Sequence, residues 1–136
     1  MSFAQATTTQ AKYVALNYLA TGTLKIALYT AEANINASTT AYTTTGEVVG
    51  TGYTAGGKTL TGVTVSQSGT TAYLNFDNVT WDPAAFTARG ALIYNATIGN
   101  LAVAVLDFGS DKTTASLFTV QMPANTATSA LIRISN

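Results

Sequence analysis

The amino-acid sequence predicts an all-β protein, an antiparallel β-sandwich or jelly roll with one short N-terminal helix. Seven or eight short runs of β-branched, aromatic and other apolar residues recur at intervals of roughly 8–12 residues, which is the spacing of strands in a sandwich. Turn-forming Gly, Asn and Asp residues separate these runs. Because the 136 residues contain no evident repeat or linker, we expect a single domain over residues 10–136, preceded by an N-terminal arm of residues 1–9.

The first twenty residues predict the arm and then the helix. Residues 1–9 are small and polar apart from Phe3, and they end in three consecutive threonines, a residue type that caps helices. Apolar side chains fall at helical spacing over about residues 10–20, and Thr21-Gly22 supplies a stop. A helix this short needs to dock on another element. The apolar side chains are Ala11, Val14, Ala15, Tyr18 and Leu19.

The remaining chain predicts strands joined by turns. Over residues 24–30, Leu24, Ile26 and Leu28 alternate with other side chains, which indicates a half-buried strand. Residues 31–45 predict an irregular surface loop. The apolar run 101–108 predicts a strand buried on both faces, followed by a turn at residues 109–112. Further strands are expected at residues 59–66, 71–76, 78–81, 88–96, 117–122 and 130–134.

Composition excludes several chemistries. Cysteine and histidine are both absent, which excludes disulfides, a thiolate nucleophile, a Cys/His zinc site and a Ser-His-Asp triad. Charged residues make up only 9% of the chain, and six basic side chains balance six acidic ones, so no basic field attracts nucleic acid. No apolar run is long enough to span a membrane, and no signal peptide is evident, so we expect synthesis in the cytoplasm without export. A near-neutral chain of this kind favours association.

Residues 52–59 match G-x-x-x-x-G-K-[ST], the phosphate-binding loop of nucleotide hydrolases. Such a loop lies between a buried strand and a helix whose N-terminus faces the phosphates. Here Lys58 is followed by a run rich in Thr, Val and Gly, which is a poor helix. The apolar run ending at Asp107 resembles a magnesium-binding strand, but the only predicted helix precedes both patterns. We therefore interpret residues 46–60 as a glycine-rich connection, with Lys58 solvated or facing a partner.

Two groups of acidic residues are candidate sites. Asp77 and Asp82 flank Trp81, as in a sugar site, but a core or interface role for Trp81 is the preferred interpretation. Asp107 and Asp111 could offer oxygens to calcium, although a solvated or salt-bridged turn is preferred because the spacing is not that of an EF-hand. Arg89 could pair with one of these aspartates. The residues therefore predict no catalytic residue, metal ion or cofactor.

Four stretches of the chain, residues 24–30, 43–57, 86–94 and 106–112, carry a resemblance to a known family. They resemble small virion proteins of tailed bacteriophages, variously labelled head decoration or cement proteins, or tail fibre proteins. The glycine segment and the Asp-Phe-Gly sequence at Asp107 are the most specific parts, and residues 2–9 are not covered. The resemblance implies a virion component without enzymatic activity and with a β-sandwich-like fold.

A capsid decoration protein that stabilises the head shell is the preferred function. Its expected partners are the major capsid protein and further copies of itself, with a trimer favoured, and its expected location is the capsid surface. Neither nucleic acid nor a membrane is an expected partner. The alternative is a tail fibre or baseplate module that binds host glycans through Tyr42 and Tyr53. The candidate protein-contact residues are Phe3, Thr7, Thr8, Thr9, Tyr53 and Lys58.

Overall fold

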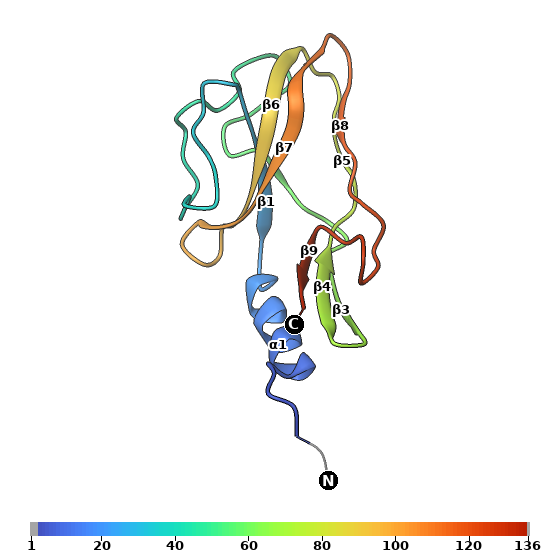
Figure 1. Ribbon diagram of the computed structural model, residues 1–136. Coiled ribbons are helices and arrows are strands. Elements are labelled where there is room, and N and C mark those ends of the chain that lie inside the picture. The colour runs from blue at the N-terminus through green and yellow to red at the C-terminus, as the bar shows by residue number, and fades with distance from the viewer. Residues whose placement is uncertain (1–2, 136) are drawn as a thin grey trace. The chain divides into compact units, whose positions relative to one another are not determined.

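The computed structural model describes residues 3–135 and consists mainly of antiparallel β-structure with one short N-terminal helix (Figure 1). The predicted all-β class is confirmed, whereas the jelly-roll arrangement stays a prediction. The elements of the described residues are α1 (Thr9–Leu19), β1 (Leu24–Tyr29), β2 (Lys58–Thr59), β3 (Thr64–Ser68), β4 (Thr71–Asn75), β5 (Val79–Trp81), β6 (Phe86–Asn95), β7 (Leu101–Thr114), β8 (Phe118–Val120) and β9 (Ile132–Ile134).

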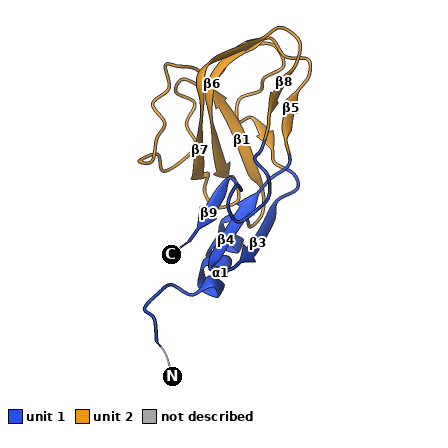
Figure 2. Cartoon of the chain, turned by 45° about the vertical axis from the view of Figure 1, so that its right-hand side comes forward, with its two compact units in different colours: residues 1–20, 61–77, 122–136 blue, residues 21–60, 78–121 orange. Residues whose placement is uncertain are grey.

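The chain divides into two compact units, each built from segments that are not continuous in sequence (Figure 2). Unit 1 contains residues up to 20, residues 61–77 and residues from 122 onward. Unit 2 contains residues 21–60 and 78–121. The expectation of a single domain over residues 10–136 stays a prediction.

Unit 1 combines α1 with a three-stranded antiparallel sheet in the order β3-β4-β9. Thr8 is the N-cap of α1, because its side-chain oxygen accepts a hydrogen bond from the amide of Ala11 at 3.2 Å. The predicted capping by threonine is therefore confirmed. The arm, however, is shorter than residues 1–9, since Thr9 is already helical. Met1 and Ser2, which also belong to the predicted arm, lie outside the described residues.

The residues of α1 that are buried are not the apolar residues that its sequence predicts to be buried. Lys12 and Leu16 are the buried residues of α1, whereas Val14 and Tyr18 are exposed. The ammonium group of Lys12 donates a hydrogen bond to the carbonyl of Thr70 at 2.5 Å. The aliphatic part of a lysine can thus lie in an apolar contact while its charged end reaches a backbone acceptor.

Unit 2 contains a four-stranded antiparallel sheet in the order β2-β1-β6-β7 and a two-stranded sheet of β5 and β8. The inner strands pair in continuous register from Leu24 opposite Asn95 to Tyr29 opposite Gly90. The prediction of a half-buried first strand is wrong, because Ala27 and Tyr29 are buried as well. Their face of the sheet is covered by residues of the 31–45 loop. That loop is irregular, as expected, and contributes Ala33, Ile35 and Tyr42 to the packing.

Strand β7 is the main departure from the predicted pattern. Residues 101–108 were expected to be buried on both faces, but β7 lies at the edge of the sheet and pairs with β6 alone among the strands, and Val105 is 38% exposed. The predicted turn at residues 109–112 is instead a bulge within the strand. Ala88 pairs with Lys112 and Gly90 with Asp107, so Arg89 of β6 lies opposite the four β7 residues 108–111. Gly109, with φ of 83°, supplies the turn-like backbone that the sequence signalled.

The remaining predicted strands are present with shifted ends. The run expected at residues 59–66 divides into β2 and β3, with Gly62 between them at a φ of 62°. Strands β3 and β4 form the predicted hairpin, in which Ser68 pairs with Thr71. The predicted alternation thus located these strands, while Gly62 divides a run that was expected to be continuous.

Gly57 provides a test of how the glycine segment packs. Its φ is 78°, and an added Cβ would lie 1.8 Å from the carbonyl oxygen of Ile26 on β1. Gly99, also in unit 2, has a φ of 58° and open space around it, which makes it a matched control. We expect Gly99→Ala to lower the free energy of unfolding by about 1–2 kcal/mol through backbone strain alone. Gly57→Ala should cost about 2 kcal/mol more because of overpacking. Urea denaturation measures both, and equal losses would contradict the close approach to β1.

Candidate functional site

The glycine-rich segment 46–60 follows one edge of β1. The amide of Val48 donates to the carbonyl of Leu28 at 2.9 Å, and the amide of Leu60 donates to the carbonyl of Leu24 at 2.8 Å. Between them, β2 pairs with β1 through Lys58 opposite Ile26. The residues after Lys58 therefore form strand rather than helix, as expected. The backbone of this segment completes the sheet, which is a different arrangement from a loop that presents its amides to phosphate.

The carboxylate of Glu47 is the centre of a hydrogen-bond network in this segment. Glu47 is only 8% exposed. Its Oε1 accepts from the hydroxyl of Tyr42 at 2.6 Å, and its Oε2 accepts from the hydroxyl of Tyr53 and from the amide of Gly56, the latter at 2.8 Å. The Tyr53 hydroxyl in turn accepts from the amide of Leu28 at 2.9 Å. A buried carboxylate is thereby supplied with three donors, which compensates its removal from water.

Two further tyrosines extend the same network. The hydroxyl of Tyr94 donates to the carbonyl of Gly56 at 2.6 Å, and that of Tyr29 donates to the carbonyl of Thr43 at 2.6 Å. The rings of Tyr42 and Tyr94 stack with centroids 4.7 Å apart. Each hydroxyl thus binds a backbone or carboxylate group of the loops that cover the sheet.

The environment raises the pKa of all four tyrosines. Burial is the largest cause in each case, and the nearby Glu47 carboxylate adds to it. The pKa of Tyr29 rises to about 12, and those of Tyr42, Tyr53 and Tyr94 also lie above the ordinary value. The four hydroxyls therefore remain protonated hydrogen-bond donors at neutral pH.

Two predicted contact residues, Tyr53 and Lys58, come together around Trp81. The ring of Tyr53 lies 6.3 Å from that of Trp81, and the ammonium of Lys58 lies 5.8 Å from the Trp81 ring centroid. Lys58 also donates to the carbonyl of Thr80 at 2.6 Å. The description of Tyr53 as an exposed aromatic is wrong, because its ring is half-buried and its hydroxyl is directed towards Glu47. Its role as a contact residue stays a prediction, as does that of Lys58.

Trp81 itself belongs to the core. It is 1% exposed, which confirms the preferred interpretation of an anchor over that of a sugar platform. Its ring contacts Phe118 edge-on at 6.1 Å, and Phe118 also contacts Phe86 at 5.2 Å and Phe108 at 6.0 Å. No spacing in the sequence signals this cluster, because its members come from β5, β6, β7 and β8.

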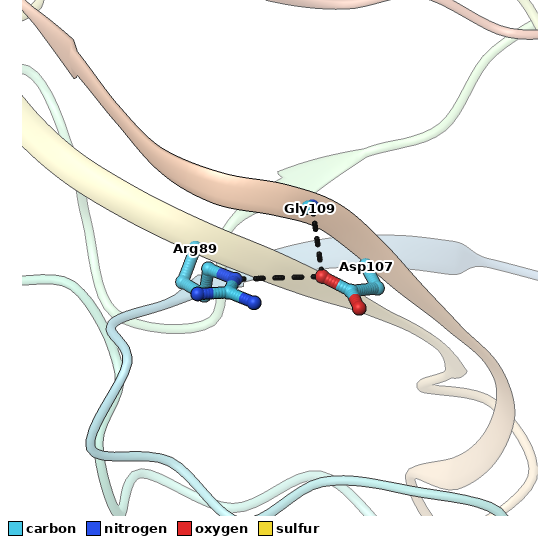
Figure 3. Close-up of polar contacts among 3 residues, drawn as sticks. All are labelled: Arg89, Asp107 and Gly109. Atoms are coloured by element: carbon cyan, nitrogen blue, oxygen red, sulfur yellow. Dashed lines mark hydrogen bonds and ion pairs between the residues drawn. The ribbon is translucent and has the colours of Figure 1, made fainter.

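Arg89 and Asp107 form an ion pair across the bulge of β7 (Figure 3). The guanidinium Nε lies 3.5 Å from Oδ1 of Asp107, and the same oxygen accepts from the amide of Gly109 at 2.8 Å. The Gly109 amide is the main cause of a lowered pKa for Asp107, and Arg89 is the next. The suggested pairing of Arg89 with an aspartate is therefore confirmed. Within residues 3–135, no cluster of three or more acidic side chains is placed to hold a metal ion.

Two depressions adjoin this part of β7. One, of about 310 Å³, lies beside Arg89 and Asp107 and extends towards Tyr29 and Ile35. The other, of about 460 Å³, has a largely apolar lining. We refer to the second as the β7–β8 depression; it is lined by Leu106, Asp107, Phe108, Lys112, Phe118, Thr119, Val120 and Gln121. An apolar concavity beside an exposed sheet edge is suited to binding an extended peptide, so this is the candidate functional site.

The predicted contact residues at the N-terminus all belong to unit 1. Phe3 is 90% exposed, and Thr7 is exposed as well. Thr8 caps α1, and the hydroxyl of Thr9 donates to the carbonyl of Gly69 at 3.5 Å. Phe3 and Thr7 are thus available for contacts, whereas Thr8 and Thr9 already have structural roles.

Sequence reasoning missed Glu47 as an organising residue. It appeared only as one letter of the glycine segment, and nothing in its spacing indicates that two tyrosine hydroxyls converge on it. The available signal was compositional, since a chain with six acidic residues places one of them directly before Val48-Val49. That signal is weak, because Val48 is buried but Val49 is 94% exposed.

Comparison with known proteins gave no match: no protein-family model, no curated protein and no solved structure matches the chain. In the part of the chain that the structure describes, no helix has the length and apolar character needed to cross a membrane.

Replacing Glu47 by glutamine tests the network. The glutamine side chain would keep the shape but present an amide nitrogen to at least one donor, so a buried donor would lose its acceptor. We expect Glu47→Gln to lower the free energy of unfolding in urea by about 2–3 kcal/mol. Glu32→Gln, at an exposed loop position, should have little effect. Equal stabilities for the two variants would show that the carboxylate does not organise the segment.

Alkaline pH provides a second test. Between pH 10 and about 12 the unfolded chain loses tyrosine protons that the folded chain retains, because the folded-state pKa values are raised. Stability should therefore be unaffected by these tyrosines below pH 10 and should fall as the pH rises above it. Tyrosinate absorbance and circular dichroism, recorded together, should show the buried tyrosines ionising as the β-structure is lost. Ionisation of all the tyrosines near pH 10, with unchanged β-structure, would contradict the raised pKa values of the four tyrosines of the network.

Proposed function

We propose that the protein is a structural component of a tailed-phage virion, and specifically a decoration protein that binds and stabilises the capsid shell. In this proposal its partners are the major capsid protein and further copies of itself, with a trimer favoured. It acts at the capsid surface through protein–protein contacts and without catalysis. The proposal starts from the resemblance of four stretches of the sequence to such virion proteins.

The observation that carries the proposal is the character of the described surface. Large apolar side chains are exposed in both units, in a chain with no net charge and few charged residues. Exposed apolar groups on a nearly neutral surface favour contact with other proteins. These side chains are Phe3, Val14, Tyr18, Val49, Val63, Val105 and Leu117.

Strand β7 supports the same conclusion. An exposed edge strand offers backbone donors and acceptors to another chain, and natural proteins usually protect such edges. Beyond its start, where the 40–42 loop pairs with it, the 14-residue strand β7 forms a long edge, which suits addition of a strand from a neighbouring protein.

The alternative, a tail fibre or baseplate module that binds host glycans, has less support. It relied on Tyr42 and Tyr53 as loop aromatics, but both hydroxyls donate to Glu47. The Tyr42 ring is also stacked on Tyr94. Neither side chain presents its polar end for sugar recognition.

The stoichiometry in purified virions separates these functions. A decoration protein should be present in copy numbers comparable to those of the major capsid protein, because it covers a symmetric shell. Quantitative staining or mass spectrometry of purified particles measures the ratio. Particles that lack the protein should also lose their genome at a lower temperature than complete particles. A few copies per particle would support the tail alternative, and absence from particles would refute both.

A further inference from the structure

Residues 3–7 of the N-terminal arm have an aromatic side chain without packing partners and a backbone without hydrogen-bond partners among the described residues. Phe3 is 90% exposed, and residues 3–7 make no backbone hydrogen bond within the described structure. These residues carry no charged side chain. A phenylalanine ring offers about 150–250 Å² of surface for burial, so such an arm is well suited to insertion into a protein.

The β7–β8 depression offers the complementary features. Leu106, Phe108, Phe118 and Val120 give it an apolar lining, and its volume of about 460 Å³ exceeds that of a single phenyl ring. The β7 backbone beside the depression is also available to form hydrogen bonds with another chain. The 40–42 loop pairs with the outer edge of β7 only at its start, through the amide of Ala102 and the bridge of Ala41 with Leu101. From residue 103 onward, the described chain provides no backbone partner on that edge.

We propose that residues 3–7 of one copy bind to the β7 edge of a second copy, with the Phe3 ring in the β7–β8 depression. The arm adds an extended segment to the sheet, and alternate side chains enter or leave the depression. This inference rests on the self-association included in the proposed function and is independent of where on the particle the protein lies.

The size of the contact indicates how copies are arranged. A stable interface buries about 800 Å² on each partner, which is more than five arm residues provide. A copy that both gives an arm and receives one makes two such contacts, one with each neighbouring copy. An arm that binds to a different surface from the one it leaves makes a head-to-tail contact, which forms a ring when the rotation between copies closes and a filament when it does not. The favoured trimer would be the closed ring of three copies.

Disulfide trapping tests the proposal, because the chain contains no cysteine of its own. Ala4→Cys places a thiol beside Phe3, and Gln121→Cys places one at an exposed position in the lining of the depression. The two single variants are mixed and oxidised, so that a bond between positions 4 and 121 can only join two chains. Val49→Cys, at a position that is 94% exposed and outside the depression, replaces Gln121→Cys in the control mixture.

We expect the bond from position 4 to position 121 to form at least about tenfold faster than that from 4 to 49, because docking raises the effective thiol concentration. Adding Phe3→Ala to the Ala4→Cys chain should remove the difference. Equal rates for the two mixtures, or no effect of Phe3→Ala, would overturn the proposal.

Sedimentation of the cysteine-free protein gives an independent readout. The unmodified chain should form an oligomer, and Phe3→Ala should raise the protein concentration at which half of the oligomer has dissociated. The circular dichroism spectrum of the variant should be unchanged. An oligomer of unaltered stability in Phe3→Ala would overturn the role of the arm but leave self-association intact. A monomer at every concentration tested would overturn both, whereas the stoichiometry in virions tests the capsid function separately.

Discussion

The loops of unit 2 depend on the hydrogen bonds that the buried carboxylate of Glu47 accepts. The carboxylate accepts hydrogen bonds from residues 42, 53 and 56, which belong to different parts of the long connection between β1 and β2. Without an acceptor, these buried donors would each carry the cost of an unmade hydrogen bond. One side chain therefore fixes both the loop that covers the sheet and the glycine segment that extends it.

The sequence was informative wherever structure depends on local spacing. The helix, the β3–β4 hairpin and the class of the fold follow from residue periodicity and turn residues. The bulge of β7 is a related case, because the Gly109 signal was correctly located but was interpreted as the end of a strand. A positive-φ glycine bends the backbone, and the pairing partner decides whether the strand continues.

Burial could not be predicted in the same way, because it depends on strand order. The apolar run 101–108 occupies the edge, whereas β6, with Arg89 and Gly90 in its sequence, is central and largely buried. The candidate site shows the same limit. Phe108 and Phe118 meet only because β7 and β8 come together in the fold, and no spacing within either segment indicates it. By contrast, the pairing of Arg89 with an aspartate could be suggested because few opposite charges were available.

The bulge opposite Arg89 has a consequence for how this surface can evolve. Four residues of β7 already lie opposite one residue of β6, and the strands are in register on both sides of the bulge. The length of this segment can therefore change without shifting the pairs on either flank. An insertion within a regularly paired stretch of the ladder would instead turn the following side chains to the other face. The surface beside the apolar depression is thus the part of the sheet in which related proteins could differ in length, and so in partner, while keeping the same core.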